Sequence, residues 1–205
     1  MRNPARLWVH DFDDSTVRRL ARCIERALST GQELLPIYIA SYGGSVYSLI
    51  AMQDLIDAAK SRGINVATIA LGSALSAAAD LLACGTKGVR FVAPGTTVMV
   101  HESIDGWSPQ KLREVEVLAS EASRLDELCF ARMDRNSGKP AGHWKKAIEA
   151  NRGADLYLPA EEVVERGLAD HVGVPLTFVR DAEVSLAFDA PKEKKPARRR
   201  KKVAA

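Results

Sequence analysis

The sequence predicts an α/β protein in which helices flank a mostly parallel β-sheet. Short apolar runs typical of buried strands alternate along the chain with longer stretches whose apolar residues recur at helical spacing. This order of strands and helices favours parallel pairing with right-handed crossovers. With 205 residues, 46% of them hydrophobic, the chain can form one core. We therefore expect one globular domain over residues 1–174, followed by a C-terminal extension over residues 175–205.

The elements of the first half each carry a local signal. Asp14 and Ser15 are helix-capping residue types, and the apolar positions after them keep a helical period until Gly31. The run at 34–40 is continuously apolar, which is typical of a buried strand. In order, we predict a strand at 7–9, a helix from 14 to about 30, a strand at 34–40, a helix at 46–59, a strand at 66–71 and a helix from about 76 to 84.

The second half is predicted to contain a helix of about twice the average length. Pro109 suits the first turn of a helix, and apolar residues then keep a roughly helical period up to Asn136. Such a long helix suggests a projecting arm that contacts a partner. The other predicted elements are strands at 89–92 and 97–100, a helix at about 142–150, an extended segment at 155–158, a helix at 159–166 and a strand-like segment at 169–174.

Positive charge is concentrated at the C-terminal end. From Pro191 onward there are eight Lys or Arg and one Glu, so this tail carries +7 and the rest of the chain −4, within a total of +3. The tail has no apolar periodicity and is predicted to be disordered. It is either a solubilising extension or a segment that contacts nucleic acid or another acidic partner.

The cysteines and the apolar runs limit the class of protein. Cys23, Cys84 and Cys129 are far apart and give no disulfide or zinc pattern. The sequence has no signal-peptide core and no apolar run of membrane length. We therefore expect a cytoplasmic protein with no metal, no cofactor and no membrane association.

Three candidate site features follow predicted strands, at the edge where parallel strands end. Gly43-Gly44 follow the strand at 34–40, Ser76 follows the strand at 66–71 through a run of small residues, and His101 follows the strand at 97–100. Acyl transfer requires a hydroxyl, a base that takes its proton, and backbone amides that bind the oxyanion. The sequence therefore predicts a hydrolase site at this edge.

Each of these residues also has a purely structural explanation. Ser76 has the position of a helix N-cap, Gly43-Gly44 fit an ordinary turn, and His101 fits a buried histidine at a strand end. Ser73 is a rival nucleophile. The spacing leaves open which acid orients the histidine, although Asp155 stands out because it follows a loop and begins an apolar extended segment. The acidic candidates are Glu102, Asp105, Asp155, Glu161, Glu162 and Asp170; the remaining histidines, read as surface or structural, are His10, His143 and His171.

Several segments occur together in one order: 37–46, 72–77, 88–101, 155–162 and 165–170. In this order and register the sequence resembles the proteolytic subunit of the ATP-dependent Clp protease, over roughly residues 6–174. The resemblance implies the fold shared with crotonases, with the long helix from Pro109 as a handle that joins two rings. The interval between Ser76 and His101 fits the family without a gap, which favours Ser76 over Ser73.

The resemblance also implies residue roles. Ser76 matches the nucleophile, His101 the general base and Asp155 the acid that orients the base. Gly44 and Ala77 match the residues whose amides form the oxyanion hole. The expected substrate-binding residues are Gly43, Ser45, Val46, Glu102 and Ser103, and residues 102–107 correspond to the strand that aligns the substrate.

The expected partners follow from the same resemblance. Family members form seven-membered rings that stack around a chamber, so we expect a homo-oligomer. The chain begins almost at the first predicted strand, without the family segment that helps to dock the ATPase, and this puts a Clp-type ATPase partner in doubt. Tyr42, Leu75 and Ala78 replace the usual Pro, Ala and Gly beside the site. A divergent or phage-encoded member is the alternative setting.

The function predicted from the sequence is a serine endopeptidase that cleaves unfolded proteins or short peptides through an acyl-enzyme. One alternative is a crotonase-like acyl-CoA enzyme, which would need no Ser-His pair. The other is a catalytically silent ring or scaffold subunit, which would typically have lost a member of the triad.

Overall fold

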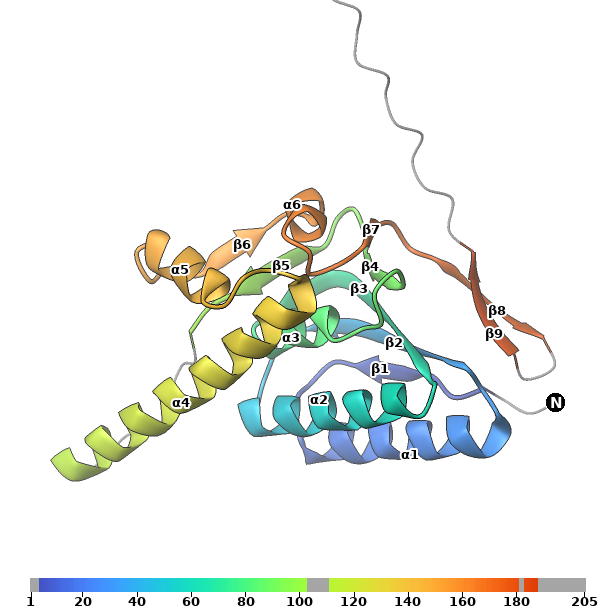
Figure 1. Cartoon of the computed structure of the whole chain (residues 1–205), viewed down its shortest axis with the longest axis horizontal. Coiled ribbons are helices and arrows are strands. Elements are labelled where there is room, and N and C mark those ends of the chain that lie inside the picture. Colours follow the sequence, from blue (N-terminus) through green and yellow to red (C-terminus); the bar gives the residue numbers. More distant parts are fainter. Residues whose placement is uncertain (1–3, 103–110, 181–182, 188–205) are drawn as a thin grey trace, which may run out of the picture.

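The computed structural model describes residues 4–102, 111–180 and 183–187, which form one main sheet, its helices and a separate hairpin (Figure 1). The strands of the main sheet are β1 (Leu7–Val9), β2 (Leu34–Ser41), β3 (Asn65–Leu75), β4 (Arg90–Val92), β5 (Thr97–Val100), β6 (Leu156–Leu158) and β7 (His171–Val172). The helices are α1 (Asp14–Thr30), α2 (Val46–Ser61), α3 (Ala77–Ala83), α4 (Leu112–Ser137), α5 (His143–Ala150) and α6 (Ala160–Glu165). The hairpin consists of β8 (Leu176–Arg180) and β9 (Glu183–Ala187).

The main sheet is mostly parallel, as predicted. Strands β1, β2, β3, β4 and β7 follow one another in this order, and all neighbours are parallel. Strand β3 is longer than the predicted 66–71 because it continues through the small residues to Leu75. Its middle pairs with β4, whereas its last residues, Ser73–Leu75, pair with β5. The sheet thus divides after Ala70, and the candidate serine follows the branch that pairs with β5.

Local capping explains where α1 and α2 begin. Asp13, and not the predicted Asp14-Ser15 pair, caps α1, because its carboxylate accepts a hydrogen bond from the Thr16 N–H at 2.7 Å. Ser45 caps α2 through a longer bond from the Ser48 N–H, at 3.4 Å. Both helices pack their apolar sides into the main core against the sheet. The fully buried residues of this core include Leu20, Ile37, Ile39, Met52, Ile56, Leu81, Leu82 and Trp144.

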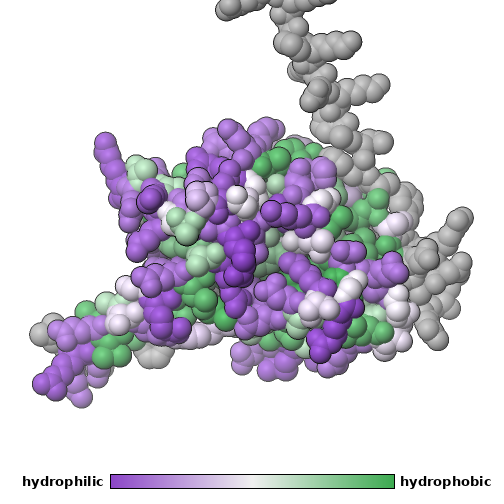
Figure 2. Space-filling view, viewed as in Figure 1, coloured by the Kyte–Doolittle hydropathy of each residue, from purple (hydrophilic) through white to green (hydrophobic). Residues whose placement is uncertain are grey.

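Helix α4 projects from the body of the protein, as expected for a handle (Figure 1). Its described part begins at Leu112, and the predicted start at Pro109 lies outside the described residues. Val115 and Val117 are exposed on this arm, and Figure 2 shows hydrophobic side chains among polar ones there, at the lower left. Across the described ranges, we find no helix with the length and apolarity needed to cross a bilayer.

The C-terminal end of α4 is fixed to the body by buried polar groups. Asp134 accepts hydrogen bonds from the N–H groups of Gly142 and Trp144, which joins α4 to the start of α5. Arg90, on β4, donates to the carbonyl of Asn136 at 3.0 Å and forms a two-bond ion pair with Asp170. The Arg90 side chain is only 3% exposed, so these bonds satisfy a charge that has almost no access to water. The base of α4 is therefore held rigidly beside α3 and the sheet.

The β8–β9 hairpin covers the sheet face opposite the main core. A second apolar cluster lies there, formed by Ala67, Ile69 and Phe91, and Leu186 of β9 packs against it. No strand or helix was predicted for residues 175–187, which were expected only to form an extension. Polar and apolar residues alternate along 183–186, a period-two pattern that is typical of a strand with one covered face. The basic tail after Pro191 lies outside the described residues.

Candidate active site

Ser76 occupies a sharp turn between β3 and α3. Its backbone has φ 56° and ψ −127°, a left-handed conformation that non-glycine residues seldom adopt. Although Ser76 stands at the N-cap position of α3, its side chain makes no capping hydrogen bond. The structural explanation for this serine, that it caps the helix, is therefore wrong. A serine on a strained turn from strand to helix is instead typical of nucleophiles that present their hydroxyl above a sheet.

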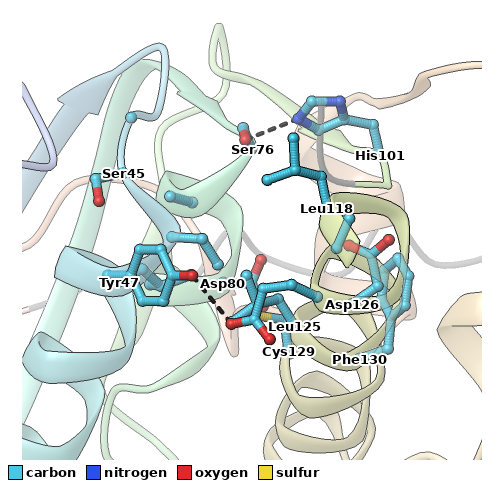
Figure 3. Close-up of a pocket in the computed structure, with 16 residues that line it drawn as sticks. Ser45, Tyr47, Ser76, Asp80, His101, Leu118, Leu125, Asp126, Cys129 and Phe130 are labelled. Carbon is cyan, nitrogen blue, oxygen red and sulfur yellow. Dashed lines mark hydrogen bonds between the residues drawn. The ribbon is translucent and has the colours of Figure 1, made fainter. Parts of the chain in front are cut away.

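The Ser76 hydroxyl contacts His101, which directly follows β5. The distance from Ser76 Oγ to His101 Nε2 is 2.7 Å (Figure 3). Sheet pairing brings the two residues together, because Leu75 lies opposite Met99 and the Ser76 N–H donates to the Met99 carbonyl at 2.8 Å. When the ring proton is on Nδ1, Nε2 accepts the hydroxyl proton, as a general base must. Ser73, the rival, lies within β3 opposite Thr97.

Asp155 lies on the other side of the His101 ring. Strand β6 is antiparallel to β5, and Val100 pairs with Leu156, so Asp155 falls opposite His101. The distance from Asp155 Oδ1 to His101 Nδ1 is 3.8 Å, longer than a hydrogen bond. The Asp155 side chain is 44% exposed, whereas that of His101 is 13% exposed. The hydroxyl, the imidazole and the carboxylate therefore lie in this order, but the imidazole and the carboxylate are not hydrogen-bonded to each other.

Gly43 lies so close to Ser76, and Gly44 so close to Phe12, that neither position has room for a side chain. A Cβ at Gly43, where φ is +103°, would lie 2.7 Å from the Cβ of Ser76. A Cβ at Gly44 would lie 2.9 Å from the Phe12 carbonyl oxygen. The pair is therefore required for close approach and is not an ordinary turn. Ala77 is the first residue of α3, so its N–H has no partner within that helix.

A pocket of about 650 Å³ opens beside Ser76, between α2, α3 and α4 (Figure 3). Gly44, Ser45, Val46, Ser76, Ala77 and His101 line one end of it. Other lining residues were not predicted and come mostly from α4: Tyr47, Leu49, Asp80, Leu118, Glu121, Ala122, Leu125, Asp126, Cys129 and Phe130. Asp80 could have been noticed in the sequence, because it interrupts the otherwise apolar run of α3. No feature of the sequence indicated that α4 would pack beside it.

Asp80 is the unusual group in this pocket. Burial, and then the nearby charge of Asp126, raise the pKa of Asp80 to about 8. The residue as a whole is only partly buried because it faces the pocket, but its Oδ1 atom is buried and has no hydrogen-bond partner. By contrast, hydrogen bonds from Arg124 and Tyr47 lower the pKa of Glu121 to about 2. Among the carboxyl groups that line the pocket, Glu121 is thus compensated by hydrogen bonds, whereas Asp80 has one oxygen without a partner.

The remaining predicted residues are less closely associated with the site. Glu102 is exposed and does not line the pocket, and Ser103, like the rest of 103–110, lies outside the described residues. His10 contacts the Ala40 carbonyl, and His171 contacts the Gly88 carbonyl, away from the serine. In the described segments we find no group of three or more His, Cys, Asp or Glu arranged to hold a metal ion.

Comparison with known proteins gives one consistent family. Residues 24–175 match the family described as Clp protease. The chain is 38% identical over 136 residues to "ATP-dependent Clp protease proteolytic subunit 3" of a Synechococcus strain, covering 66% of this chain and 64% of that protein. It is 35% identical over 138 residues to "ATP-dependent Clp protease proteolytic subunit" of Porphyromonas gingivalis, covering 67% of this chain and 59% of that protein. The matched region thus spans less than two thirds of the length of these relatives. The family match covers most of the chain and agrees with the α/β architecture, and the chain therefore belongs to the Clp protease family.

Proposed function

We propose that this protein is a serine endopeptidase with Ser76 as nucleophile, His101 as general base and Asp155 as the acid that orients the base. The observation that carries the proposal is the 2.7 Å contact between Ser76 Oγ and His101 Nε2, made by a serine in a strained turn at the edge of a pocket. The names of the relatives, proteolytic subunits of an ATP-dependent protease, support the same chemistry.

The reaction would begin with transfer of the Ser76 proton to His101 Nε2 as the oxygen attacks a peptide carbonyl. The amides of Gly44 and Ala77 would bind the oxyanion, since both residues line the pocket with Ser76 and Ala77 begins a helix. His101 then protonates the leaving amine, and water releases the acyl group by the reverse proton path. In this scheme the 3.8 Å gap to Asp155 closes when substrate orders the site, because catalytic hydrogen bonds often tighten only in the complex.

We further propose that the protein works as a homo-oligomer on unfolded proteins or short peptides. The projecting α4, with Val115 and Val117 exposed, supports a partner-contacting role for this helix. Stacked seven-membered rings and a Clp-type ATPase partner stay predictions from the resemblance, and a cytoplasmic location stays a prediction from the apolar runs of the sequence. Light scattering combined with chromatography tests the ring directly.

The proposed nucleophile is tested by replacing Ser76 with alanine. Ser76→Ala should lower the peptidase rate by about 10⁴-fold, because the hydroxyl forms the acyl-enzyme. A fluorophosphonate should label the unmodified protein once per chain, and intact-mass measurement should show no adduct on Ser76→Ala. Ser73→Ala is the matched control, since it removes a hydroxyl three residues away and should leave labelling intact. Peptidase activity in Ser76→Ala would contradict the proposal, and an unlabelled, inactive wild-type protein would favour a silent subunit.

A further inference from the structure

Asp155 lies at the end of an exposed turn between α5 and β6. On its C-terminal side the chain is fixed, because Leu156 of β6 pairs with Val100 of β5. On its N-terminal side, residues 152–154 are all exposed, so burial does little to hold them in place. The position of the Asp155 backbone therefore depends on hydrogen bonds within the turn.

This turn has a backbone that its residues do not favour. Arg152 has φ 61° and Gly153 has φ 70°, so two successive residues are left-handed. The Ala154 N–H donates to the Asn151 carbonyl at 3.1 Å and closes the turn. Two left-handed central residues are typical of a type I′ turn, in which Asn, Asp or Gly is preferred at the first of them. Arg152 is none of these, so this form of the turn depends on support from other contacts.

The Asn151 side chain supplies that support. Its amide nitrogen Nδ2 donates to the Ala154 carbonyl at 3.1 Å and to the Asp155 carbonyl at 3.0 Å. One amide group thus uses both of its hydrogens on the last two carbonyls before β6. Asn151 is itself anchored at the C-terminal end of α5, because its N–H donates to the carbonyls of Ala147 and Ile148. The amide therefore ties the backbone of Asp155 to the end of α5.

We propose that Asn151 is a positioning residue, whose amide holds the Asp155 backbone so that the carboxyl group stays within reach of His101. The proposal rests on the proposed peptidase function, because Asn151 acts only through Asp155. The distance of 3.8 Å from Asp155 Oδ1 to His101 Nδ1 is only slightly longer than a hydrogen bond. A small movement of the carboxyl group closes this distance while the backbone is held, whereas a loose turn lets the exposed carboxylate face water instead.

A double-mutant cycle tests the proposal, with the rate of fluorophosphonate labelling of Ser76 as the readout. Asn151→Ala should slow labelling by about 10-fold, because it removes both donors, and Asp155→Ala should slow it by about 100-fold or more. Adding Asn151→Ala to Asp155→Ala should slow labelling by no more than about 2-fold further, since the amide then has no carboxyl group to position. A merely structural role of Asn151 would slow both proteins by the same factor.

Asn151→Asp is a second variant of nearly the same shape that cannot donate, because an ionised carboxylate only accepts hydrogen bonds. It should slow labelling at least as much as Asn151→Ala, and it provides the same test if the alanine variant does not fold. Neither Asn151 nor Asp155 is among the described residues that line the pocket, so in peptide cleavage kcat should fall while KM stays within about 2-fold. Asn136→Ala is the matched control: this amide donates to Cys84 Sγ at the end of α4, so its loss should leave the labelling rate unchanged.

The outcomes separate this proposal from the peptidase function. Labelled protein in which Asn151→Ala has no effect, or has the same effect with and without Asp155, would overturn the positioning role and leave the peptidase function standing. Labelling that is insensitive to Asp155→Ala would overturn the role of the acid and, with it, that of Asn151. Unmodified protein that is neither labelled nor active would overturn both proposals.

Discussion

Single residues decide whether the Ser76 hydroxyl can reach its base. Three backbone positions near the site, Gly43, Gly44 and Ser76, have positive φ, and the glycines lie where a side chain would collide. Left-handed backbone at a non-glycine residue costs of the order of 1–3 kcal/mol and persists only when the surroundings enforce it. The close approach of Gly43 to the serine is part of that enforcement.

Gly43→Ala should therefore disturb the site more than the fold. The new Cβ would meet the Ser76 Cβ at 2.7 Å and the Leu75 carbonyl at 3.0 Å, so the serine or the loop must shift. We expect fluorophosphonate labelling to slow by at least 10-fold and the stability to fall by about 1–3 kcal/mol. Gly72→Ala is the control: it also places alanine at positive φ, but with nothing within 4 Å. Equal labelling rates in the two variants would show that the Gly43 approach is unimportant.

Among the helices and strands, hydrophobic periodicity predicts those whose formation depends on the local sequence. Helices α1 and α2 and the strands β2 and β3 were predicted because their apolar residues follow helical or continuous patterns. The extension of β3 to Leu75 was missed, because Gly72, Ser73 and Ala74 have no strand preference and become a strand only by pairing with β5. Ser76 and His101 were identified because both follow strands. Asp80 as a pocket residue was missed, because the pocket exists only once α4 packs beside α3.

The ion pair between Arg90 and Asp170 joins elements that local patterns do not connect. It links β4 to the turn before β7, while Arg90 also donates to the last turns of α3 and α4. Burial raises the pKa of Asp170, but hydrogen bonds and charge from Arg90 outweigh this and hold the pKa below its usual range. The pair therefore contributes stability above about pH 4, which is lost as the pH falls below that through the lowered pKa.

Asp170→Asn should accordingly lower the free energy of unfolding by about 2–3 kcal/mol at pH 7, because it leaves the Arg90 charge buried without its partner. Urea unfolding at pH 7 and pH 3 measures both effects. The difference between the variant and the unmodified protein should shrink at pH 3, because the unfolded chain, in which the pKa of Asp170 is not lowered, binds a proton more readily there. Glu162→Gln, which removes a partly exposed pair with Arg166, should cost less than about 1 kcal/mol. A pH-independent difference for Asp170→Asn would contradict the linkage.

For the whole molecule, the β8–β9 hairpin determines whether the second sheet face is covered. Leu186 packs on the cluster of Ala67, Ile69 and Phe91, whereas the neighbouring Ser185 is exposed. The hairpin was not predicted, because its residues acquire a covered face only when they return to a sheet formed by residues far earlier in the chain. Its contact with β2 is thus a product of tertiary packing.

Leu186→Asp should release the hairpin without changing the main core. A charged side chain would have to leave the apolar cluster, and we expect a loss of about 1–3 kcal/mol, the scale of one buried leucine. Hydrogen exchange should become faster at the amides of β8 and β9 and stay slow in β3. Ser185→Asp adds the same charge to the opposite side of the strand and should change stability by less than about 0.5 kcal/mol. Unchanged exchange in Leu186→Asp would mean that this contact does not hold the hairpin.

The divided pairing of β3 also limits how this chain can change in length during evolution. His101 reaches Ser76 because three consecutive residues of β5 are in register with Ser73–Leu75. Since successive residues of a strand face opposite ways, inserting or deleting one residue within β5 would turn the imidazole away from the hydroxyl. The loop from Cys84 to Val89 precedes β4 and lies outside that register, so a change of length there would not by itself turn the imidazole away. Among descendants that keep the chemistry, length differences between these two residues should therefore collect in that loop and not in β5.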